Sequence, residues 1–291
     1  MKKMLSLVMA ITMCLSLAAC SGGTTSQGES SQSPAASTPA ASSSQGASST
    51  PADAESDLAY VQDQGTLYVG ITNFAPMDYK EAGSDEWIGF DADMAKAFAE
   101  SLGVNVEFQE ITWDYKVQEL DSKTIDCVWN GMTINDEVTA AMGVSEPYCT
   151  NYQTLVYPVD RAADFEGLTS LEGLSIAVES GSAGEDAAEE LGATTVPVQS
   201  QANTLMEVAS GTADAAIIDS LMAGAMVGEG TSYDGLTYTI QLNSEEYGVG
   251  FRQGSDLAEV LNQFFVDSYA DGSMLEIAET YGVQAAIIPQ E

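Results

Sequence analysis

Residues 179–184, with the sequence Glu-Ser-Gly-Ser-Ala-Gly, form a corner with the residue types of a binding site. We predict a strand before this corner, at 174–178, and a helix after it, at 183–191. The free backbone N–H groups at the helix start would face the end of the strand, where an anion can bind. The alternative is an ordinary helix start, in which Ser182 is the N-cap and Glu185 completes a capping box.

The composition excludes several kinds of chemistry. The 291 residues include no His, 8 Lys and Arg, and 44 Asp and Glu, which gives a formal charge of −36. Without imidazole there is no Ser–His or Cys–His nucleophile pair, and the commonest transition-metal ligand is missing. We therefore expect no catalytic residue, no metal and no cofactor. The negative charge argues against nucleic acid as a partner, and solubility alone is enough to explain it.

The N-terminal segment predicts export and a lipid anchor. Lys2 and Lys3 precede an apolar run at 5–17, and Leu-Ala-Ala then leads to Cys20, the pattern of a lipoprotein signal peptide. We expect 1–19 to be removed and Cys20 to carry the lipid. Residues 20–56, rich in Ser, Gly, Ala, Thr, Gln and Pro, would form a disordered tether. The alternative is a plain secretory signal in which this cysteine occurs by chance.

The rest of the chain alternates strand-like and helix-like segments, which indicates an α/β protein with largely parallel sheets. Strands are predicted at 66–71, 104–111, 125–129, 174–178, 194–198, 213–218 and 248–252. Helices are predicted at 91–102, 114–121, 183–191, 202–210, 220–228, 256–270 and 273–281. About 235 residues suit two lobes as well as one large domain. Cys127 and Cys149 are either a disulfide or, since Cys127 lies in an apolar run, buried thiols.

Six segments of the body, in order, resemble the family-3 extracellular solute-binding proteins, the polar amino-acid receptors of ABC importers. The segments are Phe-Ala-Pro-Met at 74–77, Ile-Gly-Phe-Asp-Ala-Asp-Met-Ala at 88–95, Ile-Asp-Cys-Val-Trp-Asn-Gly-Met-Thr at 125–133, Ser-Glu-Pro-Tyr at 145–148, Asp-Ala-Ala-Ile-Ile-Asp at 214–219 and Tyr-Gly-Val-Gly-Phe-Arg at 247–252. Together they cover about 225 residues, which makes the resemblance specific although no single segment is.

The resemblance implies a two-lobed periplasmic-binding-protein fold of type II, in which the chain crosses twice between lobes. Lobe 1 would comprise 57–152 plus 247–291, and lobe 2 would comprise 153–246. The crossing strands would lie at 153–157 and 243–248. A solute bound between the lobes would stabilise their closed arrangement.

The resemblance also implies a set of ligand-binding residues. Phe74 and Trp113 would pack on the ligand, unless they are ordinary core residues. Gly131 and Thr133 would offer a backbone carbonyl and a backbone or hydroxyl donor. Ser182 would complete the anion site. Asp219 would accept the ammonium group of the ligand, unless it is only the N-cap of the following helix.

One departure from the family pattern concerns the ligand carboxylate. An arginine usually follows the Thr or Ser of the glycine loop by five residues and binds this carboxylate, but here the position holds Val138. Lys116 lies three residues after Trp113 on one predicted helix and so shares its face. We predict that Lys116 replaces the arginine. The alternative is a surface lysine paired with Glu119 or Glu110, or a ligand without a free carboxylate.

Three other residues have simpler expectations. Arg161 and Arg252 follow strands on sides where the family carries solvent-facing cations. Trp129 either forms another wall of the pocket or is buried inside lobe 1.

The function that the resemblance implies is solute capture for an ABC importer. The chain would be a monomer held by its lipid on the extracytoplasmic face of the membrane, with a small amine-bearing solute, above all an amino acid, and an ABC permease as partners. A ligand-sensing module for a membrane receptor would need the same closure. An enzyme on this fold, such as a dehydratase, is the remaining alternative, but no acid–base pair at a suggestive spacing supports it.

Overall fold

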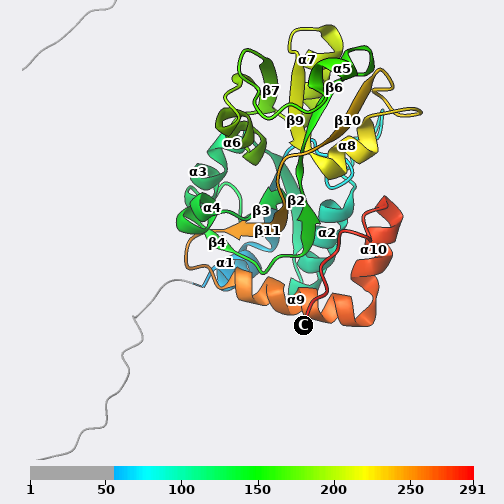
Figure 1. Cartoon of the computed structure of the whole chain (residues 1–291). Coiled ribbons are helices and arrows are strands. Elements are labelled where there is room, and N and C mark those ends of the chain that lie inside the picture. Colours follow the sequence, from blue (N-terminus) through cyan, green and yellow to red (C-terminus); the bar gives the residue numbers. More distant parts are fainter. Residues whose placement is uncertain (1–55) are drawn as a thin grey trace, which may run out of the picture. The chain divides into compact units, whose positions relative to one another are not determined.

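The computed structural model describes residues 56–291, so the predicted signal peptide, Cys20 and the predicted tether through residue 55 lie outside the described residues. The described chain is α/β, as predicted, and contains two separate sheets (Figure 1).

Sheet 1 has the order β2-β1-β3-β11-β4, with β5 paired to β11. Strands β1, β2 and β3 run parallel, whereas β4 and β5 run antiparallel to β11, which is itself antiparallel to β3. Its strands are β1 (Thr66–Ile71), β2 (Asn105–Glu110), β3 (Cys127–Thr133), β4 (Gly143–Val144), β5 (Cys149–Asn151) and β11 (Glu245–Phe251).

Sheet 2 has the order β10-β6-β9-β7-β8, in which β7, β8 and β9 are parallel and β6 and β10 are antiparallel to their neighbours. The central strand β9 is buried along its whole length, in keeping with its continuous apolar sequence. The strands are β6 (Gln153–Pro158), β7 (Ser175–Glu179), β8 (Thr194–Val198), β9 (Ala215–Asp219) and β10 (Leu236–Gln241). The predicted lobe boundaries fall between β5 and β6 and within β11, and they stay a prediction.

Helices pack against both sheets (Figure 1). They are α1 (Asp57–Gln64), α2 (Phe90–Leu102), α3 (Lys116–Asp121), α4 (Asp136–Ala141), α5 (Ala162–Phe165), α6 (Ala183–Glu190), α7 (Gln201–Ser210), α8 (Ser220–Met226), α9 (Leu257–Asp271) and α10 (Ser273–Tyr281), with the 3₁₀ turns η1 (Trp113–Tyr115) and η2 (Val159–Arg161). Three hydrophobic clusters form the core.

The seven predicted strands and seven predicted helices are all present; β1, β8 and α10 have the predicted ends, and the ends of the others are shifted. The predicted helix at 114–121 begins as the 3₁₀ turn η1 and continues as α3. Helices α1, α4 and α5 and strands β4, β5 and β10 were not predicted.

A backbone requirement explains the glycine before α2. Gly89 has φ +128°, and a Cβ there would lie 2.1 Å from the carbonyl oxygen of Met77. Only glycine fits this close approach. The loop that it contacts contains the cis Ala75–Pro76 bond and leads back to Phe74, one of the predicted site residues.

Candidate functional site

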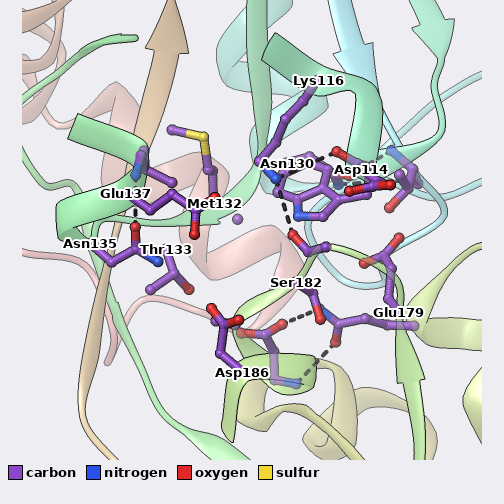
Figure 2. Close-up of a pocket in the computed structure, with 18 of the residues that line it drawn as sticks. Asp114, Lys116, Asn130, Met132, Thr133, Asn135, Glu137, Glu179, Ser182 and Asp186 are labelled. Atoms are coloured by element: carbon purple, nitrogen blue, oxygen red, sulfur yellow. Dashed lines mark hydrogen bonds between the residues drawn. The ribbon is translucent and has the colours of Figure 1, made fainter. Parts of the chain in front are cut away.

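A cavity of about 190 Å³ is lined by residues of both sheets and their loops. By volume it would hold on the order of ten water molecules, or a solute of similar size. The wall includes all seven predicted ligand-binding residues, which are Phe74, Trp113, Lys116, Gly131, Thr133, Ser182 and Asp219. Figure 2 shows side chains converging on it from several sides, with Lys116 at the top, Thr133 at the left, and Ser182 and Asp186 below.

The two predicted aromatic residues are both core and wall. Phe74 is 2% exposed and packs edge-on against Tyr247, with ring centroids 6.3 Å apart. Trp113 is 7% exposed and belongs to a hydrophobic cluster behind the cavity. Each ring therefore has one side in the core and another available to a bound solute, and the two sequence interpretations do not exclude one another.

Gly131 is held in place by a buried carboxylate. Its N–H donates to Asp91 at 2.7 Å, and the hydroxyl of Tyr148 donates to the same carboxylate at 2.8 Å. Burial raises the pKa of Asp91 to about 7. Gly131 has φ +54°, and a Cβ there would lie 2.2 Å from the Phe74 ring. Sequence reasoning found Asp91 only as part of a motif and missed this positioning role.

Lys116 extends into the cavity rather than onto the surface (Figure 2). Its Nζ donates to the carbonyl oxygen of Gly181 at 3.1 Å, and lies 4.9 Å from the centre of the Trp113 ring. The predicted alternative, a pair with Glu119 or Glu110, is not among the ion pairs of the described chain. Burial lowers the pKa of Lys116, although nearby carboxylates oppose the shift.

The helix start at α6 is capped by its own side chains. Ser182 Oγ accepts a hydrogen bond from the N–H of Glu185 at 3.3 Å, and the Glu185 carboxylate accepts one from the N–H of Gly181 at 2.8 Å. This is close to the capping box that the sequence offered as the alternative. Since the N–H of Gly181 is already occupied, the corner has less free capacity for an external anion than predicted.

Asp219 ends β9 and is 3% exposed. The hydroxyl of Tyr247 donates to its carboxylate at 2.7 Å, and side-chain amides also donate to it, from Asn151, Gln153 and Gln201. Burial raises its pKa to about 7, and the charge of Glu245 adds to the shift. It is the N-cap residue of α8, as the alternative interpretation held, but its side chain makes no capping hydrogen bond.

Glu179, at the end of the neighbouring strand β7, was not predicted as a site residue. It lines the cavity, is 3% exposed, and has one carboxylate oxygen with no hydrogen-bond donor among the described residues. Burial raises its pKa to about 8, and the nearby Asp219 adds to the shift. The signal in the sequence was an acid closing an apolar strand directly before the corner at 180–184.

The structure also places three other residues that the sequence analysis discussed, Arg252, Trp129 and Val138. Arg252 was expected to face solvent, which is wrong: it is 9% exposed and forms ion pairs of 3.0 Å with both Asp57 and Asp126. Trp129 is fully buried among aromatic rings and does not line the cavity. Val138, where the family arginine would lie, does line it.

Arg161 is partly exposed and pairs with Asp164 and Asp214. Cys127 and Cys149 are buried free thiols, so the disulfide is absent. Within residues 56–291, no group of three or more His, Cys, Asp or Glu side chains is arranged to hold a metal ion. Across the same range, every helix is too short or too polar to cross a membrane.

Two mixed sheets with a solute-sized cavity lined from both define the class as a periplasmic binding protein of type II. The family model of the bacterial extracellular solute-binding proteins, family 3, matches residues 67–284, and the chain belongs to this family.

Relatives differ in what their names say they bind. The arginine-binding extracellular protein ArtP of Bacillus subtilis is 27% identical over 215 residues, covering 72% of this chain and 82% of ArtP. The L-cystine-binding protein TcyJ of Escherichia coli K12 is 26% identical over 231 residues, covering 78% and 86%. The crystal structure of the ancestral amino acid-binding protein AncCDT-1, described as a precursor of cyclohexadienyl dehydratase, aligns with a TM-score of 0.69 and 31% identity, covering 78% and 99%.

Proposed function

We propose that this protein captures a small amine-bearing solute, above all an amino acid, outside the cytoplasm and delivers it to an ABC importer. The observation that carries the proposal is the pair of buried carboxylates, Asp219 and Glu179, in a solute-sized cavity. Neither forms an ion pair with any Lys or Arg of the described chain. A buried carboxylate without a cationic partner carries a desolvation cost, which here raises the pKa of both groups, and an amine on the solute can offset that cost. The family and the amino-acid-binding relatives support the same solute class.

The ligand contacts follow from the cavity wall. Asp219 attracts the ammonium, although its protein donors already satisfy much of the carboxylate and its contribution is therefore mainly charge. Lys116 is the one cation among the lining residues, and it binds the ligand carboxylate in place of the arginine absent at Val138. The rings of Phe74 and Trp113 pack on the apolar part of the ligand.

Three smaller residues complete the proposed site. Gly131 contributes its carbonyl, since its N–H already donates to Asp91. The hydroxyl of Thr133 donates to Glu245 at 3.0 Å, so its lone pairs are what it offers a ligand. Ser182 contributes from the α6 side.

Closure of two lobes is the mechanism of capture. The cavity wall combines residues attached to sheet 1 with residues attached to sheet 2. A solute that touches both sides stabilises the closed arrangement by its differential affinity for that state. The ABC permease would recognise this closed form.

Attachment to the membrane through a lipid on Cys20 completes the proposal. Replacing Cys20 by Ala should release the protein from the membrane fraction into the medium or periplasm without changing solute affinity. Retention of the variant in the membrane fraction would contradict lipid anchoring.

Calorimetry of the protein with a panel of amino acids, amines and short peptides tests the central proposal. We expect one chemical class to bind. At a hundredfold excess of ligand over Kd, stabilisation should reach about 2.7 kcal/mol, which a thermal melt detects. A panel in which no solute binds refutes solute capture.

The alternatives predict other outcomes in the same experiment. Consumption of a bound solute would identify an enzyme, an alternative that AncCDT-1 keeps relevant because its description links it to a dehydratase. A sensing module would bind like an importer component but would not support uptake when reconstituted with a permease.

A further inference from the structure

Glu179 presents an unmet hydrogen-bonding need inside the cavity. Only 3% of its surface is exposed, and its Oε1 has no hydrogen-bond donor within residues 56–291. Gln153, beside Asp219 in the same wall, also has a buried side-chain oxygen without a donor. The amide oxygen of Gln153 can only accept, and Glu179 Oε1 can only accept when its carboxyl group is ionised, so donors on a bound molecule would satisfy both atoms.

The charges around the cavity are unbalanced. Its lining carboxylates are Asp114, Glu137, Glu179, Asp186 and Asp219, against one lining cation, Lys116. Asp114, Glu137 and Asp186 are exposed, so water screens them. Glu179 and Asp219 are buried and lie at the ends of the neighbouring parallel strands β7 and β9. One ammonium group on the ligand can neutralise one of these two buried carboxylates and leaves the other unpaired.

We propose that Glu179 binds a second positively charged group, so that the solute carries two cationic groups rather than one. The inference rests on the proposed function and deepens it. Asp219 is matched by the α-ammonium, Lys116 by the carboxylate, and Glu179 by an amine or guanidinium at the far end of the solute. The substrate class is therefore an amino acid with a cationic side chain.

A solute with an apolar side chain would leave the Glu179 oxygen buried without a donor. Sites built around a buried polar group discriminate strongly against analogues that lack the matching group. The aromatic rings of Trp113 and Phe74 are compatible with the methylene stem of such a solute. The ammonium of Lys116 is near enough to Glu179 for each charge to offset part of the shift that burial causes in the other's pKa, but the two side chains form no ion pair within the described residues.

Calorimetry with chain-length-matched probes tests the proposal. L-Lysine, L-ornithine and L-arginine carry both cationic groups, L-norleucine has the lysine skeleton without the second one, and cadaverine lacks the carboxylate. We expect at least one basic amino acid to bind about a hundredfold or more tightly than norleucine. The variant Glu179→Gln should weaken that binding about thirtyfold or more and leave norleucine within threefold. The control Glu137→Gln, an exposed glutamate in the same wall, should change the affinity for every probe by less than about fivefold.

The number of protons released on ligand binding provides a second test, because it would not change if Glu179 had only a structural role. Because burial raises the pKa of Glu179 to about 8, much of the free protein is protonated there at pH 7. A cation bound at Glu179 displaces this proton. Calorimetry in buffers of different ionisation enthalpy should show more proton release by the wild type than by Glu179→Gln, in which only the release from Asp219 remains. The variant should fold at least as well as the wild type, since it removes a buried carboxyl group without a full set of partners.

The outcomes separate this inference from the proposed function. Neutral amino acids that bind as tightly as basic ones, or an unchanged affinity in Glu179→Gln, overturn the role of Glu179 and leave solute capture standing. Tight binding of cadaverine that depends on Glu179 supports the second cationic site and removes Lys116 as the carboxylate partner. An entire probe panel without binding, neutral amino acids included, overturns both.

Discussion

Replacing Lys116 by Met removes the one ammonium group in the cavity wall and keeps a side chain of similar length. In the structure its Nζ lies 3.1 Å from the Gly181 carbonyl oxygen and forms no ion pair within the described chain. A ligand carboxylate at this point would form a charge-assisted hydrogen bond in a water-poor site. Removing one partner of such a pair costs about 2–5 kcal/mol. We therefore expect Lys116→Met to raise the Kd for an amino acid by a factor of about thirty to several thousand.

Stability should change little in the same variant. The chain loses one hydrogen bond to a carbonyl group, but it also avoids the cost of desolvating a half-buried ammonium. The net effect should stay within about 1 kcal/mol, or about 2–4 °C in Tm.

Lys80→Met is the matched control for Lys116→Met. Lys80 also lies over a tryptophan ring, 4.5 Å from the centre of Trp87, but it is exposed and outside the cavity. Calorimetry and thermal melts on both variants give the comparison. A Kd within threefold of the wild type in Lys116→Met, or an equal loss in the control, would refute the role of Lys116.

Three further predictions concern the wall, the core and the pH. Gly131→Ala should abolish binding and destabilise the fold by about 1–3 kcal/mol, because the new Cβ would lie 2.2 Å from the Phe74 ring; circular dichroism would separate this from global misfolding, and wild-type affinity would contradict it. Arg252→Leu should lower the free energy of unfolding by about 3–5 kcal/mol, since two buried carboxylates lose their partner; denaturant titration should show the loss with an unchanged Kd. Burial raises the pKa of Glu179 from about 4.5 in the unfolded chain to about 8 in the fold. The free energy of unfolding therefore has the full contribution of Glu179 below pH 4.5 and loses it as the pH rises through about 8. The stability gained by Glu179→Gln over the wild type should therefore grow across this window and then level off, and a flat difference would contradict a buried, shifted carboxyl group.

The elements that the sequence predicted well have strong local signals. Strand β9 is a continuous apolar run that ends in a polar residue, and α6 begins with Ser182 and a glutamate three residues later. These signals depend on neighbours along the chain. Helix α1 has local caps at Ser56 and Gly65 but only a weak apolar pattern, and its Asp57 pairs with Arg252, 195 residues away. No local pattern contains that contact, which also explains why the exposure of Arg252 was wrongly predicted.

The candidate site divides in the same way. The family resemblance and the spacing of Lys116 to Trp113 were enough to find seven lining residues. Phe74, Gly131, Thr133 and Asp219 lie within the six matched segments, each at a strand end or loop that the fold brings to the cavity. The burial and the hydrogen-bond partners of each side chain could not be read from the motifs, because they depend on tertiary packing. Asp219 is surrounded by protein donors, the N–H of Gly181 is occupied by Glu185, and Glu179 retains an oxygen without a donor. The bond between Gly181 and Glu185 is local, whereas the donors to Asp219 come from residues distant in the chain, such as Tyr247 and Gln153.

The amino-acid sequence by itself determined the α/β class, because apolar periodicity and caps are local properties, and its resemblance to family 3 indicated the family and the residues that could meet in one cavity. It also determined that no histidine is present. Only the tertiary structure decided which charges are buried and unpaired, since desolvation depends on what packs around a group from every side. That is why Lys116 could be proposed from its spacing to Trp113, whereas Glu179 emerged only when β7 and β9 were placed side by side.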